Sequence, residues 1–248
     1  MIATTKEKKT NLSVNPDEML EAGLQFGHKT STINPKIKPY LFGVRNGVYL
    51  FDLDKTAEKL KEALDFISTL ILEGKNLLLV GTKIQIKKIL KETAEECGLP
   101  YINERWLGGT FTNFETIKKR IEYFRDLEAK KESGELEKYT KKEKAKFDHE
   151  LARLSLSFGG VKNLTSLPEA IFVVDMKKDA LCIKESKIKG IKIIAIADTN
   201  VDPTLADYPI PANDDAISSV KYILEKLKET VLKNRSKKTV KEEKPVKK

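Results

Sequence analysis

The sequence predicts an α/β protein in which a parallel sheet is covered by helices on both faces and an antiparallel helical hairpin is inserted. Short apolar runs with little polar alternation are separated by amphipathic runs, the pattern of buried parallel strands joined by helices. Between residues 112 and 157 this alternation stops, and two charged helical runs follow each other directly. At 248 residues the chain has room for one large domain or two small ones, taking about 150 residues per domain.

Three strands, each followed by a helix, define the predicted sheet. The strands are NLLLV (76–80), AIFVVD (170–175) and IKIIAIAD (191–198), and the helices lie within 81–98, 177–190 and 213–232. Asn213 is expected to cap the last helix, and Thr82 with Gln85 matches a capping box for the first. A helix that follows a strand can also bind a nucleotide phosphate. The sequence lacks both glycine-rich nucleotide signatures, however, so we favour the capping box.

The region before the first of these strands predicts a β-hairpin and a helix. The run KPYLFGVRNGVYLFD (38–52) is expected to turn at Asn46-Gly47, because both central positions of such a turn favour positive φ. The amphipathic run 54–74 then predicts a helix capped by Asp54.

Residues 112–157 predict the inserted hairpin. Apolar residues stand at 3-4-3 spacing in the first run and 4-3-4 in the second: Phe114, Ile117, Ile121 and Phe124, then Phe147, Leu151, Leu154 and Phe158. Such narrow seams on charged helices indicate an antiparallel coiled coil. Two capping boxes mark the helix starts, Thr112 with Glu115 and Thr140 with Glu143. Glycine pairs stand at both ends, Gly108-Gly109 and Gly159-Gly160, where close approach or unusual φ is expected.

Composition argues against several classes of protein. No apolar run approaches the roughly 18–20 residues that span a membrane, so no membrane partner is expected. The first residues match neither a secretory signal nor a transit peptide. Cys97 and Cys182 are far apart and form no C-x-x-C motif, which favours two buried thiols over a disulfide or a zinc site. We therefore expect a cytoplasmic protein.

The net charge of +9 is concentrated in three segments. Segment 233–248 carries +6, while segments 1–15 and 112–158 carry +2 each, which leaves −1 for the rest. Basic clusters of this kind contact phosphate backbones or form solvated arms. For the C-terminal tail the sequence does not distinguish these two alternatives. On the hairpin the lysines and arginines are interleaved with glutamates, so a solvated face is the default there.

Carboxylates at strand ends are the main hint of catalysis. Asp52, Asp175 and Asp198 each close an apolar strand, and the turn 198–215 adds further aspartates that could hold magnesium or calcium. The calcium-loop spacing is absent from the sequence, and Asp and Asn beside Pro are common turn builders. We therefore expect no catalytic residue, metal ion or cofactor.

The rarest side chains also favour structural roles. His28 and His149 are the two histidines, and no sequence pattern places either as a base beside a serine or cysteine. Trp106 is the sole tryptophan. We expect it to pack at the base of the hairpin, although an indole can also stack on a nucleotide base.

Seven stretches in order resemble one family, the small-subunit ribosomal protein two (S2) family of bacteria and organelles. They are MLEAGLQFGHKT (19–30), NPKIKPYLFGVRNGVYLFDLDKT (34–56), LLLVGTK (77–83), RWLGGTFTNF (105–114), GGVKNLTSLPEAIFVVD (159–175), IAIADTNVDP (194–203) and IPANDDAI (210–217). The resemblance runs from about Met19 to Leu232.

The resemblance implies a flavodoxin-like three-layer αβα domain and a non-catalytic structural role in the small ribosomal subunit. Implied partners are small-subunit ribosomal RNA, neighbouring small-subunit proteins and the mRNA-binding ribosomal protein one, with no small-molecule substrate. The RNA-facing candidates are His28, Lys29, Lys36, Lys38, Arg45, Arg105, Trp106, Lys118, Lys119 and Arg120. Glu104, an acid next to Arg105, weakens this expectation locally.

The expected division of the chain has four parts. Residues 1–15 form a flexible basic arm, 16–111 and 158–232 the α/β sheet domain, 112–157 the inserted hairpin, and 233–248 a disordered lysine-rich tail. Two other hypotheses compete with the ribosomal one. A Rossmann-like enzyme would use Asp175 and Asp198 but leaves the hairpin without a purpose. A hairpin adaptor that binds only proteins leaves the basicity unexplained.

Overall fold

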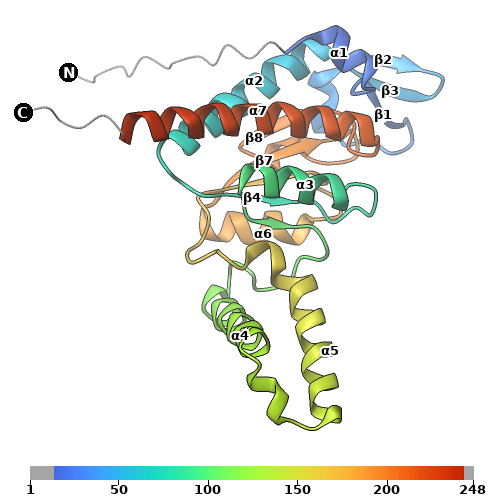
Figure 1. Ribbon diagram of the computed structural model, residues 1–248. Helices are drawn as coiled ribbons and strands as arrows, with labels where there is room; N and C mark the ends of the chain where they lie inside the picture. The colour runs from blue at the N-terminus through green and yellow to red at the C-terminus, as the bar shows by residue number, and fades with distance from the viewer. Residues whose placement is uncertain (1–13, 243–248) are drawn as a thin grey trace, which may run out of the picture. The chain divides into compact units, whose positions relative to one another are not determined.

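The computed structural model describes residues 14–242, with side chains to residue 236 (Figure 1). Most of the predicted N-terminal arm and the last six residues of the predicted tail lie outside the described residues. The described chain divides into two compact units. The first comprises residues 14–76, 196–204 and 208–242, and the second comprises 77–195 and 205–207.

The main sheet has five strands in the order β5-β4-β6-β7-β8. Its strands are β4 (Leu77–Val80), β5 (Tyr101–Ile102), β6 (Ala170–Val173), β7 (Lys192–Ala197) and β8 (Tyr208–Pro211). The pairs β4–β5, β4–β6 and β6–β7 are parallel, and the hydrogen bonds from Asp207 N to Ile193 O and Ala212 N to Ala197 O continue that sense to β8. If these five strands are numbered 1 to 5 along the chain, their order across the sheet is 2-1-3-4-5, which is consistent with a flavodoxin-like fold.

Burial explains why the strands β4, β6 and β7 lack alternation. Every residue of β4 and β6 is buried, as are five of the six residues of β7. A strand that is covered by helices on both faces must be apolar throughout, as these are. The predicted parallel sheet flanked by helices is therefore confirmed.

The first unit contains a small antiparallel sheet and two long helices. The sheet order is β1-β3-β2, formed by β1 (Phe26–Lys29), β2 (Leu41–Arg45) and β3 (Val48–Phe51). The hairpin turns at Asn46 and Gly47, whose φ values of 50° and 73° match the predicted turn. The short helix α1 (Pro16–Glu21) and the 3₁₀ helix η1 (Pro35–Tyr40) frame this sheet in the chain.

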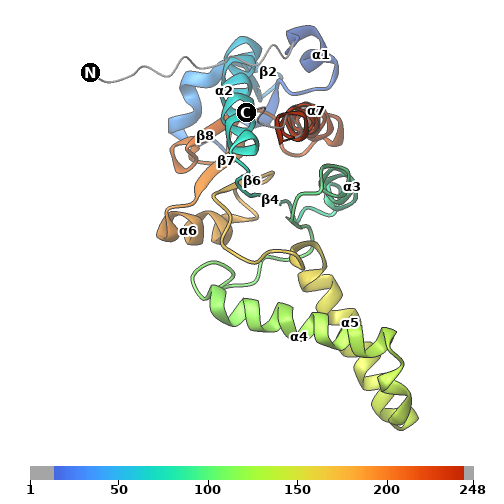
Figure 2. The same cartoon turned by 60° about the vertical axis from the view of Figure 1, so that its left-hand side comes forward.

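Helices α2 (Leu53–Leu72) and α7 (Ile217–Glu242) lie side by side in the first unit (Figures 1 and 2). Their apolar faces are fully buried at Leu60, Ile67, Ile223 and Leu227. Helix α7 continues ten residues beyond Leu232, where the sequence predicted the disordered tail to begin. Asn234 is buried and donates to the Thr230 carbonyl, so the packed part of the helix extends past that boundary.

The second unit contains the remaining helices. They are α3 (Lys87–Cys97), α4 (Phe114–Glu132), α5 (Lys141–Phe158) and α6 (Ala180–Lys189), with the 3₁₀ helices η2 (Glu135–Lys138) and η3 (Gly159–Val161). Another 3₁₀ turn, η4 (Pro203–Leu205), spans the boundary between the units. The fully buried side chains of this unit include Leu77, Leu79, Ile86 and Phe111.

Helices α4 and α5 contact each other, and part of each predicted apolar seam is buried. Ile121, Phe124 and Leu127 are buried on α4, and Leu151, Leu154 and Phe158 are buried on α5. Polar pairs also join the helices: Tyr123 Oη donates to Glu150 Oε2 at 3.2 Å, and Lys131 Nζ lies 2.6 Å from Asp148 Oδ1.

Several predicted helix caps are wrong. Asp52 rather than Asp54 caps α2, since its carboxylate accepts from the N–H groups of residues 54 and 55. The box predicted at Thr112 does not form because that hydroxyl and N–H bond to Glu185 instead. Thr82 bonds to Asp179, and α3 begins only at Lys87.

One other predicted cap is present. The capping box of Thr140 and Glu143 forms at the start of α5 as expected. Asn213 Oδ1 accepts from the N–H groups of Asp215 and Ala216, but α7 begins only at Ile217, so Asn213 forms a turn before the helix instead of capping it. In the part of the chain that the structure describes, no helix is long and apolar enough to cross a membrane.

Candidate nucleic-acid interface

The basic side chains near the start of α4 have no acidic partner among the described residues. Lys119 and Arg120 are exposed and Lys118 is half-buried. None of the three forms an ion pair with a residue that the structure describes. Further along the same two helices, Lys131 lies 2.6 Å from Asp148 and Lys144 lies 2.6 Å from Glu137. The positive charge near the N-terminal end of α4 is therefore available to an external anion.

The loop before α4 contains two of the predicted RNA-facing residues, one exposed to solvent and the other buried. Arg105 is exposed, whereas Trp106 is only 6% exposed and packs edge-on against Phe111 at 4.8 Å between ring centroids. The Trp106 indole N–H donates to Glu185 Oε1. Trp106 thus packs at the base of α4 in this structure, while Arg105 reaches solvent. Glu104, the acid beside Arg105, pairs with Lys87.

Glu185 on α6 accepts five hydrogen bonds from this loop. Its Oε1 accepts from the Trp106 indole at 3.2 Å and from Gly109 N at 2.8 Å. Its Oε2 accepts from Phe111 N at 2.9 Å and from the N–H and hydroxyl of Thr112 at 3.1 and 3.2 Å. Burial alone would raise the pKa of Glu185, but these donors outweigh it and hold the pKa below its ordinary value.

One glycine of each predicted pair is required by the geometry. Gly109 has a φ of +91°, which side chains rarely adopt. A Cβ on Gly160 would lie 2.2 Å from the Tyr101 carbonyl oxygen, so η3 could not approach β5 as it does. Gly108 and Gly159 have ordinary space around them, with nearest atoms at 3.7 Å. The two pairs therefore serve different needs.

The N-terminal candidates lie on the small antiparallel sheet and η1. Lys29, Lys38 and Arg45 are exposed and form no ion pair with a described residue. Lys36 is exposed too, but its Nζ lies 2.6 Å from Asp202 Oδ2. Segment 26–51 contains these four basic residues and no Asp or Glu. The absence of acids from this segment is a sequence signal for a basic surface. It is missed when the net positive charge is assigned to three other segments.

His28 is held by carboxylates within the first unit. Its Nδ1 lies 3.1 Å from the buried Asp198 Oδ1, and its Nε2 lies 3.4 Å from Asp215 Oδ2 and 3.0 Å from the Asn200 amide nitrogen. The hydrogen bond to Asp198 raises the pKa of His28 above its ordinary value of 6.5. In its protonated form, His28 would offset the negative charge of the buried Asp198.

The same groups are a candidate cation site. His28, Asp198 and Asp215 offer ligand atoms that all lie within 4.8 Å of one another. In this geometry, however, the two ring nitrogens of His28 face different carboxylates. Asp198 also accepts from the Thr199 hydroxyl and from Asp214 N, so its carboxylate already has several donors.

The strand-end aspartates of the enzyme hypothesis are bonded within the chain. Asp175 Oδ2 lies 2.9 Å from Lys83 Nζ, and Asp175 Oδ1 accepts from the N–H groups of Lys177 and Lys178. Next to it, Asp179 accepts from the Thr82 hydroxyl at 2.9 Å. Between β4 and β6 the strand order reverses, and doubly wound proteins bind nucleotides at that position. Here side chains of the chain itself bridge the two strand ends.

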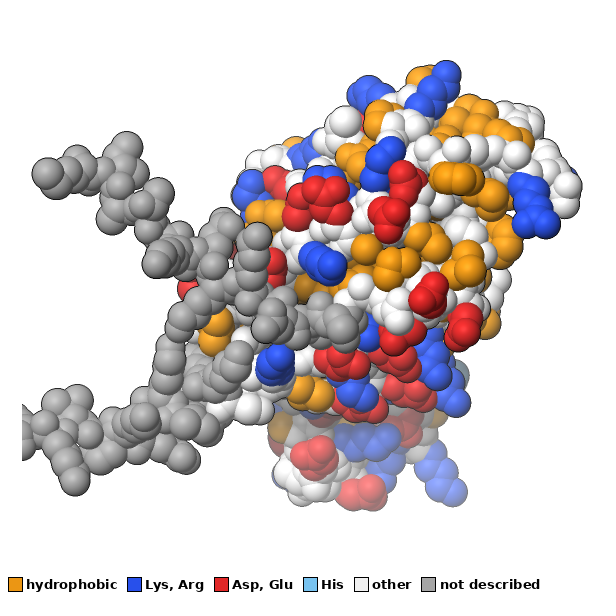
Figure 3. Space-filling model, turned by 90° about the horizontal axis from the view of Figure 1, so that it is seen from above, with side chains coloured by type: hydrophobic (Ala, Val, Ile, Leu, Met, Phe, Trp, Pro, Cys, Tyr) orange, Lys and Arg blue, Asp and Glu red, His pale blue; other side chains and the backbone are white. Residues whose placement is uncertain are grey.

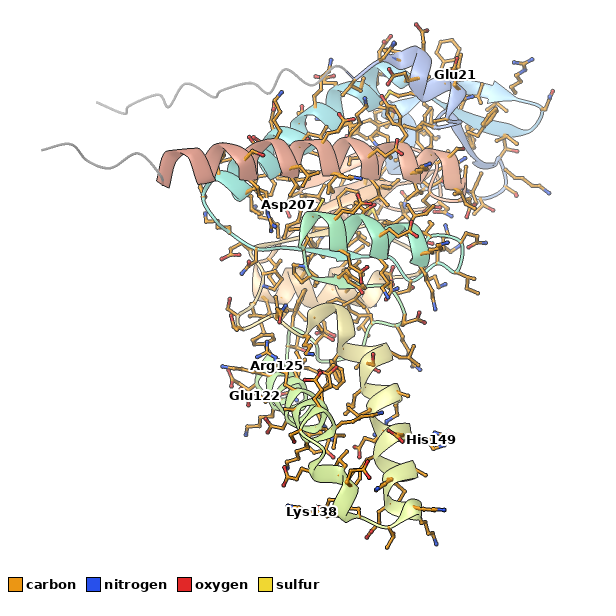
Figure 4. The ribbon with its side chains drawn as sticks, in the orientation of Figure 1. Glu21, Glu122, Arg125, Lys138, His149 and Asp207 are labelled. Atoms are coloured by element: carbon orange, nitrogen blue, oxygen red, sulfur yellow. The ribbon has the colours of Figure 1, made fainter. Side chains whose placement is uncertain are left out.

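The remaining reactive groups of the described chain lie apart from these clusters. His149 is exposed and points away from α4 (Figure 4). Cys97 and Cys182 are buried thiols, and burial raises the pKa of the Cys182 thiol. In the view of Figure 3, basic and acidic side chains are interspersed with apolar ones. No single-sign patch covers the described part of that face.

These observations define a class of protein: an α/β protein whose sheet-edge carboxylates are bonded within the chain. Several of its exposed arginines and lysines have no acidic partner among the described residues and so suit an anionic partner. The model of the family Ribosomal protein S2 matches residues 19–234. Small ribosomal subunit protein uS2 of Coprothermobacter proteolyticus is 46% identical over 218 residues, which are 88% of this chain and 81% of that protein. The chain belongs to the ribosomal protein S2 family.

Family membership settles the broad function. The chain is a non-enzymatic structural constituent of the small ribosomal subunit, and its predicted association with the ribosome is confirmed. The enzyme hypothesis is thereby excluded. Glu185 could not be singled out from the sequence, because a single glutamate in a helical run gives no signal that its carboxylate is buried by a loop about 75 residues earlier.

Proposed function

We propose that the chain binds small-subunit ribosomal RNA through two basic regions. One is the start of α4 with the preceding Arg105, and the other is the exposed set Lys29, Lys38 and Arg45. Lysine and arginine side chains of this kind neutralise phosphates and fix the position of a protein on RNA without reading its sequence. Lys36 and His28, which have acidic partners, are secondary candidates, and Trp106 supports its loop.

The observation that carries this proposal is the lack of described acidic partners at Lys118, Lys119 and Arg120. Lysines and glutamates are interleaved along both helices, so most of this surface could be self-neutralised, as it is at Lys131 and Lys144. Lys130, Lys138, Lys141, Lys142 and Lys146 share the lack of an ion pair with a described residue and extend the candidate surface.

The domain division belongs to the same proposal. Helices α4 and α5, with the connecting η2, would form the antiparallel hairpin inserted in a three-layer sheet domain, within residues 112–157. The contact between the two helices and the buried seams support it. The basic charge of segments 1–15 and 233–248 would add to RNA association.

The test is a salt titration of binding to the source organism's small-subunit ribosomal RNA. Each phosphate contact contributes about −0.7 to −0.9 to the slope of log affinity against log salt. The triple variant K118Q/K119Q/R120Q should therefore reduce the magnitude of that slope by about 2. The matched control K88Q/K184Q/K187Q removes the same charge from exposed positions on α3 and α6. It should retain most of the slope.

Equal slopes for the natural chain and the triple variant would contradict a role for the start of α4. An equal reduction in both variants would show that only total charge matters. The family resemblance further implies recruitment of the mRNA-binding ribosomal protein one. Small subunits purified without this chain should then retain less protein one than subunits to which it has been added back, and equal retention would contradict that role.

A further inference from the structure

The loop between β5 and α4 is fastened to α6 at a single carboxylate. Five donors from four residues of the loop converge on Glu185 at 2.8–3.2 Å, and the side chain is buried. Three of these donors are backbone N–H groups within residues 109–112, just before Phe114 begins α4. A buried backbone N–H without an acceptor is costly, so the buried N–H of Phe111 requires an acceptor at this position, and the half-buried N–H groups of Gly109 and Thr112 share it.

No other described group replaces Glu185 at the start of α4. The N-cap residue, Asn113, makes no side-chain capping bond to the helix. The Thr112 hydroxyl, expected to cap α4, is turned to Glu185. Gly109 adopts positive φ within the same loop, which permits the chain to present successive N–H groups to one carboxylate. The end of α4 that carries the candidate RNA residues is thus oriented through α6.

We propose that Glu185 is a positioning residue: by holding residues 106–112 it sets the direction of α4 relative to α6, and so places Arg105, Lys118, Lys119 and Arg120 for RNA. This inference rests on the proposed function of those basic residues. Glu185 itself is buried and negatively charged, so it does not contact RNA. Its effect on RNA affinity is indirect and passes through the loop.

Glu185→Gln tests this role with little change in volume. An amide retains one acceptor oxygen but turns its NH₂ group toward N–H donors, so the loop loses part of its anchor. The chain's sole tryptophan reports the change directly, because its indole N–H is one of the donors. We expect shifted Trp106 emission, and a salt slope reduced by about 1. Each phosphate contact makes binding about eightfold tighter at about 0.1 M salt than at about 1 M salt. Losing one contact therefore lowers the affinity at about 0.1 M salt by that factor.

Glu92→Gln is the matched control, since it removes one negative charge from an exposed position in the same unit. It should leave both the emission and the slope unchanged. If Glu185→Gln does not fold, Gly109→Ala perturbs the same loop at its +91° φ without altering the carboxylate. It should also reduce the slope.

A shifted tryptophan emission with unchanged RNA affinity and slope would overturn the inference, because Glu185 would then only stabilise the fold. The triple variant K118Q/K119Q/R120Q separates the two proposals. If that variant binds as the natural chain does, the proposed function fails at α4. If that variant loses slope while Glu185→Gln and Gly109→Ala do not, the positioning role alone fails.

Discussion

At the scale of single residues, three buried carboxylates organise this protein. Asp175, Asp198 and Glu185 are each no more than 5% exposed, and each accepts at least three hydrogen bonds or ion pairs, at least one of them from a distant part of the chain. A buried charge is costly unless it is paired and hydrogen-bonded. From sequence, Asp175 and Asp198 can be recognised as strand-end acids, but whether such an acid is catalytic or structural depends on its partners. Those partners are fixed only by the fold.

The pairing of His28 with Asp198 gives a prediction about pH. The pKa of His28 is raised above 6.5, so the charged imidazole stabilises the folded chain fully below pH 6.5. That contribution is lost as the pH rises through the folded-state pKa. The histidine is 27% exposed, and we expect its charged hydrogen bond to contribute about 1–2 kcal/mol. The difference in free energy of unfolding between the natural chain and His28→Gln should therefore shrink as the pH rises.

Urea unfolding at several pH values measures that difference, and NMR of the imidazole measures the pKa itself. His149→Gln is the control, because it removes the other, exposed histidine and leaves a single imidazole signal. Titration of His28 at or below 6.5 would contradict the expectation.

At the scale of elements, the glycine pairs that bracket α4 and α5 show how far a sequence pattern can be taken. The pattern indicated correctly that both ends of the segment have unusual backbone requirements. The pattern could not show that Gly109 is required for its positive φ, whereas Gly160 is required because a side chain would collide with Tyr101. Nor could it show that the adjacent Gly108 and Gly159 have ordinary space around them. The same limit explains the caps: Thr112 matched a capping box, but Glu185 competed for its hydroxyl from across the unit.

Gly160→Ala should destabilise the protein because the new Cβ would lie 2.2 Å from the Tyr101 carbonyl oxygen and 2.7 Å from its ring. Overpacking of this kind costs about 1–3 kcal/mol. Gly159→Ala is the natural control, since Gly159 has helical φ and ψ and its nearest atom is 3.7 Å away. It should be neutral or slightly stabilising. Urea unfolding measures both, and equal stabilities would contradict the close approach of η3 to β5.

At the scale of the whole molecule, hydrophobic patterning was sufficient for the fold class. The buried strands β4, β6 and β7 and the principal helices follow from it because apolar runs are read directly. The strands β1, β5 and β8 are not buried throughout and have little pattern of their own, so pairing with neighbours determines them. The candidate interface was less accessible to prediction. Whether a lysine is free or paired depends on which acid the fold brings within reach, as Lys36 and Asp202 show.

The net charge of +9, and the exposed basic side chains that have no acidic partner in the described part of the chain, lead to a prediction for the assembled particle. A tagged copy expressed in its host should comigrate with the small ribosomal subunit on a sucrose gradient at moderate salt. It should dissociate gradually as salt rises, because counterions compete with lysine and arginine for phosphates. The K118Q/K119Q/R120Q variant should dissociate at lower salt than the natural chain, while K88Q/K184Q/K187Q should follow the natural chain. If all three chains stay on the subunit equally well at every salt concentration, then contacts with neighbouring proteins, rather than with phosphates, hold this chain in the subunit.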